Sequence, residues 1–375
     1  MEQTRIESNR MASSSSTPIP KHYEVLEAND SIQPLQSFGK SPSGRGRLGT
    51  CTGIRIAGTG SYIPQQVVTN EDLAELGCDS DWIVQRTGIR ERRRATKNQA
   101  TSDLAFEAAN DCLRDAGVSA ADVDLLICAT ITPDYMTPST ACILQNRLGC
   151  VAPAFDVNAA CAGFMVGLVT AAQYVRSGMA TNALVVGSEI MSRTVDTSDV
   201  KTYPLFGDGA GAALLQPCAP TNSNGLIRFT LGAEGDVHAL CIPGGGSREP
   251  LTAQTLATGR QFLQMDGRTV FKWAVRVVED SVNDVLQTAG LQAKDIDLVI
   301  LHQANIRILD AAISHFAIPR ERMFVNLDRF GNTSAASIPL ALDQANREGR
   351  LNRGDLVLLS GFGAGLSWGT CLLRW

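Results

Sequence analysis

The chain has 375 residues and a formal net charge of −5, with 44% hydrophobic and 19% charged residues. This length allows two domains or one large duplicated unit, and the negative charge excludes a general nucleic-acid binder. No apolar run reaches the length of a membrane span, so we expect no membrane partner. Ten cysteines occur without a Cys-x-x-Cys pair, which predicts reduced thiols and neither a disulfide framework nor a metal site.

The first 50 residues differ in composition from the rest of the chain. They contain the run Ser13–Ser16, several prolines and the segment Gly44–Arg47, without hydrophobic periodicity. We therefore expect residues 1–50 to form a disordered extension, or to reflect a start site placed too early. The run from Met11 could open a plastid transit peptide, but acidic residues at positions 24, 27 and 30 argue against one. A cytoplasmic location is the expectation.

The first ordered element is predicted from Ile54, where a short β-like run ends in glycines. Gly58 and Gly60 begin a Gly-x-Gly pattern, but Ile63 occupies the third glycine position of a dinucleotide-binding fingerprint, which excludes that motif. Trp82 and five arginines follow in residues 82–94. Two interpretations stay open here: a salt-bridged surface face, or a site where arginines bind phosphate and the indole stacks on a base.

An internal repeat is the most informative feature of the sequence. Asn110–Ile127 and Asn283–Ile300 are identical at ten of eighteen positions. Each copy predicts the end of an amphipathic helix, a glycine stop, a short loop and a buried strand. Leu184–Ser188 and Leu356–Ser360 continue the correspondence at nearly the same spacing. The chain is therefore predicted to hold two copies of one α/β unit, with parallel, helix-covered sheets.

Cys161 lies where an apolar run, residues 151–157, stops at small residues and a helical pattern begins. This order predicts a strand, a tight turn and a helix, with the thiol at the positive end of the helix dipole. A thiolate there would be a strong nucleophile with room for an acyl group. The alternative is one more buried, inert cysteine.

The repeat places two further polar residues at strand-end turns. His302 follows an apolar run in the second copy, and Asn332 lies near the counterpart of the Cys161 turn. Ligands of open α/β sheets collect at the carboxyl ends of strands, so we expect Cys161, His302 and Asn332 to meet. A neutral histidine can act as a base or a hydrogen-bond donor, and an asparagine amide can donate to a carbonyl oxygen.

Three other segments give weaker signals. Phe206–Leu215 lacks the lysine of a phosphate-binding loop and predicts a tight turn into a strand. Gly361–Gly365 follows a strong strand, so its bare backbone either donates N–H groups to an oxyanion or packs closely against another backbone. The segment from Met265 to Lys272 predicts the start of a helix, on which Lys272 is more typical of a surface residue than of a ligand.

Four motifs together resemble those of the thiolase-like condensing enzymes, and specifically of the β-ketoacyl-[acyl-carrier-protein] synthase III family. They are Asn158–Phe164, Leu301–Arg307, Gly331–Ser337 and Trp82–Arg90. The resemblance runs from about Gly53 to Trp375. It implies a thiolase-like α/β fold, in which duplicated halves form a layered α-β-α-β-α sandwich. The halves are expected at 51–225, with the nucleophilic cysteine, and at 226–375, with the histidine and asparagine.

The resemblance also implies an activity that needs no cofactor and no metal. The cysteine takes an acyl group from an acyl-coenzyme A (acyl-CoA). Malonyl-acyl carrier protein (malonyl-ACP) then loses carbon dioxide, and its carbanion attacks the acyl-enzyme to give a β-ketoacyl-ACP. The catalytic triad falls on Cys161, His302 and Asn332. The oxyanion donors are the backbone of Cys161 and of the turn at Gly363 and Ala364.

The same resemblance implies binding residues and a homodimer. Trp82 would stack on the adenine of CoA. The residues expected along the pantetheine channel are Arg86, Gly267, Phe271, Lys272 and Asn305. Those expected to face the acyl carrier protein are Gln303, Arg307 and Lys272. The acyl pocket would involve Phe362 together with Met136 and Thr137, on a loop that comes from the partner subunit.

Two positions depart from the family pattern. Val200, next to Lys201, stands where many members carry an arginine against the adenine, so the adenine clamp is expected to be weaker or rebuilt. Thr137 precedes Pro138 where a phenylalanine is common. Since threonine removes a large aromatic wall, we hypothesise that the pocket admits primers longer or bulkier than acetyl.

Other condensing enzymes and related subunits differ from this family in their partners or in their catalytic residues. An enzyme of polyketide or secondary metabolism would carry the same Cys-His-Asn set and stays open as an alternative. A thiolase would need a second catalytic cysteine near the C-terminal glycine turn, whereas Cys371 lies in the final apolar strand. A non-catalytic subunit of a condensing heterodimer usually loses the nucleophile, which this chain keeps.

Overall fold

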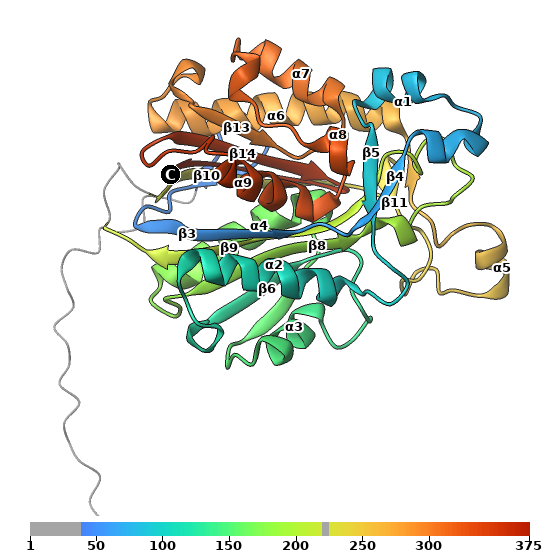
Figure 1. The fold of residues 1–375 in the computed structure, drawn as a ribbon. Coiled ribbons are helices and arrows are strands. Elements are labelled where there is room, and N and C mark those ends of the chain that lie inside the picture. The colour runs from blue at the N-terminus through green and yellow to red at the C-terminus, as the bar shows by residue number, and fades with distance from the viewer. Residues whose placement is uncertain (1–38, 220–224) are drawn as a thin grey trace, which may run out of the picture. The chain divides into compact units, whose positions relative to one another are not determined.

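The computed structural model describes residues 39–219 and 225–375, in which two large sheets dominate (Figure 1). The first sheet has the strand order β3 (Ile54–Tyr62), β9 (Asp208–Pro217), β8 (Ala183–Ile190), β6 (Leu125–Ala129) and β7 (Ala154–Val157). The second has the order β1 (Gly39–Lys40), β2 (Arg47–Gly49), β10 (Gly225–Asp236), β15 (Gly365–Arg374), β14 (Leu356–Gly363) and β13 (Leu298–Leu301). Two small sheets pair β4 (Gln66–Thr69) with β5 (Glu91–Arg94), and β11 (Leu240–Cys241) with β12 (Gln264–Met265).

Each large sheet mixes parallel and antiparallel pairs. β6 pairs parallel with both β7 and β8, and β13 pairs parallel with β14. β9 and β15 are antiparallel to the strands beside them. The prediction of parallel sheets was therefore wrong for these strands. Only Ala364 separates β14 from β15, and a parallel pair needs a crossover of about a dozen residues.

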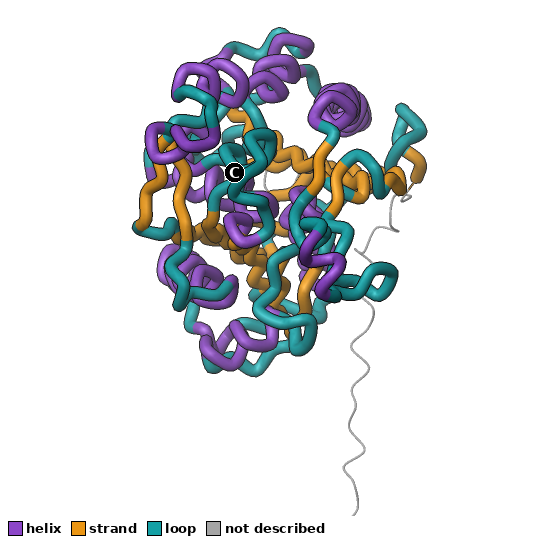
Figure 2. Tube along the Cα trace, turned by 90° about the vertical axis from the view of Figure 1, so that its right-hand side faces the viewer, coloured by secondary structure: helices purple, strands orange, loops and turns teal. Residues whose placement is uncertain are grey.

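Helices occupy three layers, one between the sheets and one on each outer face (Figures 1 and 2). The middle layer holds α4 (Gly163–Arg176) and α9 (Ser337–Arg347). The first sheet is covered by α2 (Thr101–Ala116) and α3 (Thr140–Leu148), and the second by α6 (Gly267–Ala289) and α7 (Ile306–His315). The predicted α-β-α-β-α sandwich is thus confirmed. The remaining helices are short: α1 (Ser80–Thr87), α5 (Ala253–Ala257) and α8 (Leu327–Phe330).

The sequence repeat is also a repeat of backbone conformation. α2 and α6 both end at a left-handed glycine, Gly117 at φ 66° and Gly290 at φ 68°, and each is followed by a 3-10 turn and a buried strand. The turns before α4 and α9 correspond as well. Ala160 at φ 46° and Ser334 at φ 50° are both left-handed residues other than glycine. Cys161 lies within the first of these turns, and Asn332 lies two residues before the second.

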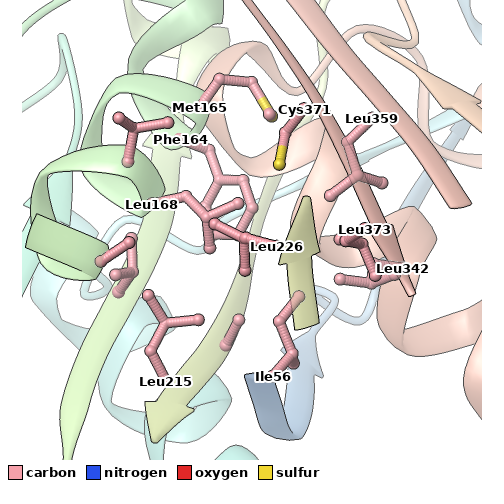
Figure 3. Close-up of a cluster of buried hydrophobic side chains, with 14 of the residues drawn as sticks. Ile56, Phe164, Met165, Leu168, Leu215, Leu226, Leu342, Leu359, Cys371 and Leu373 are labelled. Atoms are coloured by element: carbon pink, nitrogen blue, oxygen red, sulfur yellow. The ribbon is translucent and has the colours of Figure 1, made fainter. Parts of the chain in front are cut away.

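The core between the two sheets holds α4 in place. Figure 3 shows Phe164, Met165 and Leu168 of α4 among side chains of both sheets, such as Leu215 and Leu359. All five are fully buried. Burying one such side chain contributes about 1.5–3 kcal/mol. The start of α4, where Cys161 lies, is therefore anchored on both sides.

Residues 39–49 correct the predicted N-terminal extension. β2 pairs with residues 229–231 of β10. Ser43 donates to the Asp284 carboxylate through its backbone N–H at 2.8 Å and its hydroxyl at 2.7 Å. Arg45 forms ion pairs with Glu234 and, at 2.6 Å, with Asp280. The prediction of disorder was wrong here because the contacts that order this edge hairpin come from residues far along the chain. Residues 1–38, the rest of that prediction, lie outside the described residues.

The strand before Cys161 is shorter than predicted. The apolar run begins at Val151, but β7 starts at Ala154 and the Val151 side chain is 94% exposed. Pro153 separates the two parts and lacks the N–H group that a strand in a ladder donates. The strand, turn and helix around Cys161 are otherwise as predicted.

Candidate active site

A cavity of about 1350 Å³ collects the three predicted catalytic side chains. Cys161, His302 and Asn332 all line it, although they lie on three separate turns. Phe362 and Gly363, at the end of β14, form part of the same wall. The structure therefore brings together the residues that the repeat was expected to bring together.

Cys161 lies in the 3-10 turn Ala160–Ala162 between β7 and α4. Its side chain is 7% exposed, and burial raises the pKa of the thiol to about 12. Burial is the largest of the causes that act on this pKa, so Cys161 rests as a thiol and not as the thiolate that was expected at the helix start. A hydrogen bond with the Ser334 side chain acts in the opposite direction and lowers the pKa of Cys161.

Gly363 faces the Cys161 turn at close range. A Cβ atom on Gly363 would lie 2.7 Å from the backbone nitrogen of Cys161 and 2.8 Å from its Cβ. Only glycine permits this approach. Ser367 fixes the same contact, because its hydroxyl donates to the Ala159 carbonyl at 3.0 Å. Close packing of two backbones is thus observed, and the role of Gly363 and Ala364 as oxyanion donors stays a prediction.

His302 follows β13 and presents a neutral imidazole. Burial lowers the pKa of its ring to about 3. Nδ1 lies 2.7 Å from the Ser337 hydroxyl, and the tautomer in which Ser337 donates leaves the proton on Nε2. Phe362 contacts the ring edge-on, with 5.3 Å between ring centroids. Of the two roles considered for His302, that of a hydrogen-bond donor fits, since a group with this pKa is a weak base.

Asn332 is held by its backbone and by its side chain. Its N–H donates to the Leu205 carbonyl at 2.8 Å, and its carbonyl accepts from Gly207 at 3.1 Å. Its side-chain Oδ1 accepts from the backbone N–H of Ser334 at 2.8 Å. This bond assigns the orientation of the amide and leaves the Nδ2 group as a donor for a ligand.

Cationic and aromatic side chains surround the cavity mouth. The Arg86 guanidinium lies 4.5 Å from the Trp82 ring centroid, and Arg307 lies 5.6 Å from that of Phe271. Asn305 joins these elements by donating to the Arg86 carbonyl at 3.0 Å. Such a combination suits a ligand with phosphates and a purine. The residues of this group that line the cavity are Arg86, Gly267, Arg268, Phe271, Lys272, Asn305 and Arg307.

Gln303 does not have the predicted role of contacting a carrier protein. Its side chain is 1% exposed. Nε2 donates to the Leu301 carbonyl at 2.7 Å, and Oε1 accepts from the backbone N–H of Asn326 at 3.1 Å. A side chain engaged inside the fold cannot reach a docking protein, so this prediction was wrong.

Neither of the two interpretations covers the whole arginine-rich segment. Arg92 is fully buried and donates to the carbonyls of Val68 at 3.1 Å and Pro204 at 2.8 Å. Arg94 lies over the Tyr203 ring, at 4.2 Å from its centroid. These β5 arginines hold the fold together, whereas Arg86 lines the cavity.

The predicted acyl-pocket residues lie at different depths. Phe362 is buried in the cavity wall. Met136 lines the cavity but is 87% exposed, and Thr137 beside it is exposed. This exposure suits a loop that reaches a second subunit, which stays a prediction. Lys201 is exposed and Val200 half-buried, and the weakened adenine clamp also stays a prediction.

Three residues around the triad were missed in the sequence. Ser337 contacts His302, Ser334 contacts Cys161, and the buried Glu189 accepts a hydrogen bond from Ser334 at 3.0 Å. Both serines lie within the motif Gly331–Ser337, where they look like ordinary residues of a helix start. Glu189 gave one signal, since it is the single charged residue in the apolar stretch 184–190, and a buried carboxylate needs partners.

Family models match both halves of this site. The model described as 3-oxoacyl-[acyl-carrier-protein (ACP)] synthase III matches residues 155–235, which include Cys161. Its C-terminal counterpart matches residues 286–375, which include His302 and Asn332. None of the helices in the described residues is long and apolar enough to cross a membrane.

Relatives and solved structures cover most of the chain. The β-ketoacyl-[acyl-carrier-protein] synthase III of Rhodopirellula baltica is 59% identical over 345 residues, which span 88% of this chain and 100% of that protein. The protein of the same name from Symbiobacterium thermophilum is 48% identical, over 86% of this chain and 98% of its own. The crystal structure of 3-oxoacyl-[acyl-carrier-protein] synthase III from Aquifex aeolicus VF5 has a TM-score of 0.78 and 42% identity, over 86% of this chain and 100% of that one.

A relative from another pathway shares the fold. The priming β-ketosynthase from the R1128 polyketide biosynthetic pathway has a TM-score of 0.78 and 35% identity, over 87% of this chain and 97% of that one. Together these similarities define the protein as a thiolase-like condensing enzyme, an acyltransferase. The chain belongs to the β-ketoacyl-[acyl-carrier-protein] synthase III family.

Proposed function

We propose that this enzyme performs the initiating condensation of fatty acid biosynthesis with Cys161, His302 and Asn332 as its catalytic groups. It transfers an acyl group from acyl-CoA to Cys161 and joins that group to malonyl-ACP, with release of carbon dioxide. The observation that carries this assignment is that Cys161, the neutral imidazole of His302 and the amide of Asn332 line one cavity. The names of the relatives support an acyl carrier protein as the partner.

The acyl-transfer half of the reaction uses the Cys161 turn. Sγ attacks the thioester carbon, and the carbonyl oxygen becomes an oxyanion. The backbone N–H of Cys161, together with one from the Gly363–Ala364 turn, suits this oxyanion because the two backbones are packed together before substrate arrives. Fixed donors stabilise developing charge without the cost of reorganising water.

The condensation half uses His302 and Asn332. Loss of carbon dioxide from the malonyl group leaves an enolate, whose negative oxygen needs donors. A neutral imidazole with its proton on Nε2 and an amide with a free Nδ2 are two such donors. Since neither has to give up its proton, both can serve each turnover unchanged. The enolate carbon then attacks the Cys161 thioester and releases the thiolate.

The cavity mouth suits both substrates in turn. Arg86, Phe271 and Asn305 are suited to line the pantetheine arm, and Trp82 with Arg86 to hold the adenine end. Lys272 and Arg307 add positive charge where an acidic carrier protein would dock, and such docking weakens as salt rises. CoA and the carrier protein share the pantetheine arm, so one channel serves both.

The acyl pocket is expected to admit primers that are longer or bulkier than acetyl, as well as acetyl itself. Thr137 offers a smaller side chain than phenylalanine at the predicted subunit contact, and the exposed Met136 beside it suits a loop that completes the pocket of a second copy in a homodimer. The bacterial origin of the relatives supports a cytoplasmic rather than a plastid location.

Priming of a polyketide pathway is the second candidate function. The likeness to the priming β-ketosynthase of the R1128 pathway favours it, since the shared fold covers 97% of that protein and 87% of this chain. The two functions differ in the carrier protein that is used. Turnover with a fatty-acid carrier protein and not with a polyketide carrier protein would decide for the first.

The direct test is intact-mass measurement of the acyl-enzyme. Acetyl-, butyryl- and octanoyl-CoA should each give one adduct on Cys161 at comparable rates, and Cys161→Ala should give none. Cys142→Ala is a matched control, because Cys142 is exposed and outside the cavity, and it should keep the adduct. Acylation of Cys161→Ala would overturn the role of this thiol, and strict acetyl preference would overturn the primer hypothesis.

A further inference from the structure

The hairpin of β1 and β2 lies before the part of the sequence that resembles the family, which begins at about Gly53. In the structure it extends the second sheet, because β2 pairs with residues 229–231 of β10. The turn of this hairpin, residues 41–46, is closed by the backbone N–H of Ser41, which donates to the Gly46 carbonyl at 2.9 Å. The proposed mechanism does not use the hairpin, but its turn contacts two elements that line the cavity.

Arg45, in this turn, reaches a carboxylate on each of those two elements. Its Nη1 pairs with Glu234 near the end of β10, and its Nε lies 2.6 Å from the Asp280 carboxylate on α6. The Arg45 side chain is 19% exposed, so solvent weakens these ion pairs less than it would at a fully exposed site. One planar guanidinium thus joins the strand to the helix through two different nitrogen atoms.

Glu234 also binds the first turns of α6. Its Oε2 accepts a hydrogen bond from the indole Nε1 of Trp273 at 3.2 Å. The Trp273 ring contacts the Trp368 ring of β15 edge-on, with 6.2 Å between ring centroids. Trp273 directly follows Phe271 and Lys272, which line the cavity. The carboxylate that the hairpin holds therefore also fixes the part of α6 that carries these two cavity residues.

Glu234 lies in a bulge of the cavity wall. Ala233 of β10 pairs with Ser367 of β15. Asp236 pairs with Gly365, so the register shifts between the two pairs and Glu234 lies in the irregular part. All four paired residues line the cavity. Because a bulge interrupts the regular ladder of hydrogen bonds, side-chain contacts have a larger share in fixing its conformation.

We propose that Arg45 positions the mouth of the substrate cavity by holding the β10 bulge and the start of α6 together. This inference rests on the proposed function, in which the start of α6 binds the pantetheine arm that CoA and the carrier protein share. Arg45 does not touch the substrate and acts through Glu234 and Asp280, so it is a positioning residue. Its loss weakens the binding of both thioester substrates.

The turn beside Cys161 has supports of its own. The Ser367 hydroxyl donates to the Ala159 carbonyl at 3.0 Å, and Ser367 pairs with Gly363 across β15 and β14. Neither contact involves the hairpin. Loss of the Arg45 ion pairs should therefore shift the wall of the cavity mouth and leave the catalytic turn in place, so the effect falls on binding and not on the chemical steps.

The test is the dissociation constant of CoA, measured by isothermal titration, together with KM and kcat for butyryl-CoA and malonyl-ACP. Arg45→Ala should raise the dissociation constant and both KM values by about fivefold, while kcat changes less than about twofold. Glu234→Gln should give the same result, because it cuts the same ion pair. The double variant should bind CoA no more weakly than either single variant, since both remove one interaction.

A purely electrostatic role of Arg45 predicts a different sign for Glu234→Gln. CoA carries negatively charged phosphates. Arg45→Ala removes a positive charge and Glu234→Gln removes a negative one, so charge alone would weaken CoA binding in the first variant and strengthen it in the second. Tighter binding of CoA by Glu234→Gln would overturn the positioning role.

Ser43→Ala is the matched control. Ser43 anchors the same turn, but its hydrogen bonds go to Asp284, which lies further along α6 and outside the cavity lining. This variant should lower the melting temperature, because the buried Asp284 carboxylate loses a donor, and should keep the CoA affinity of the unaltered enzyme. If Ser43→Ala weakened CoA binding as much as Arg45→Ala, the hairpin would act through general stability, and the role assigned to Arg45 would be overturned.

Failure of the proposed function would give a separate result. If the unaltered enzyme neither bound CoA nor formed an acyl adduct on Cys161, the proposed function would be rejected. If the unaltered enzyme did both, and Arg45→Ala matched it in dissociation constant and in KM, the positioning role alone would be rejected.

Discussion

The turn that carries Cys161 and the turn that follows Asn332 share one backbone but hold different chemistry. Ala160 and Ser334 are left-handed at φ 46° and 50°, and each is the first residue of a 3-10 turn that leads into a helix of the middle layer. The first turn presents a thiol. The second presents an amide, and its helix supplies the serine that orients His302. The repeat preserves the backbone, whereas in the proposed function one half captures the acyl group and the other stabilises the enolate.

Removal of the Cys161 thiol should reveal the largest difference in function between the two turns. In Cys161→Ala, acyl transfer should fall at least about 1000-fold, because no nucleophile remains at the turn. Decarboxylation of malonyl-ACP should continue, since its donors lie on the other turn. CoA release and carbon dioxide release, measured in parallel, check this. Equal loss of both activities would contradict the division of labour.

Removal of the amide should give the opposite pattern. In Asn332→Ala, condensation should fall by about 100- to 1000-fold, the usual cost of one lost donor to a developing oxyanion. Acylation of Cys161 should change less than about tenfold, because its oxyanion donors are backbone groups of the other turn. Single-turnover CoA release and steady-state β-ketoacyl-ACP formation distinguish the two effects. If acylation fell more than condensation in this variant, the proposed role of Asn332 as a donor to the enolate would be contradicted.

The fold could be predicted where the signal is local or repeated. The helix end at Gly117 and the one at Gly290 each precede a buried strand, and identity between the copies marked both. Cys161 was recognisable for the same reason, since an apolar run, small residues and a helical pattern stand in order. Local periodicity and turn chemistry decide such elements.

The parts that escaped prediction depend on distant partners. Ser43 is ordered by Asp284, 241 positions later, and no local pattern reveals that pair. Gln303 lies in a catalytic motif, yet its amide is used inside the fold. Glu189 becomes meaningful only when Ser334, 145 positions away, is seen to contact it. The sequence shows the polar residues that form such tertiary hydrogen bonds. It contains no regular spacing that would reveal which of them are paired.

The two halves should also differ in how pH affects stability. The folded pKa of His302, about 3, lies below the ordinary value of 6.5, so its contribution is lost as pH falls from about 6.5 towards 3. Glu189, with a folded pKa of about 7 against 4.5, contributes most below about pH 4.5 and loses this contribution as pH rises through 7. Urea midpoints of His302→Asn and Glu189→Gln, compared with the unaltered enzyme across this range, should show slopes of opposite sign. Parallel slopes would refute the protonation states assigned here.

The smallest effect concerns the shared backbone itself. Ala160→Gly should change the free energy of unfolding by less than about 1 kcal/mol, in the stabilising direction, because glycine adopts φ 46° without the Cβ strain of alanine. Ser334→Gly relieves the same strain but removes a donor from the buried Glu189 carboxylate, which should cost about 1–3 kcal/mol. The two variants should therefore change the free energy of unfolding in urea in opposite directions, although the two turns have the same backbone conformation. If both variants shift the midpoint alike, the conformation of the turns, and not the side chains they hold, governs their stability.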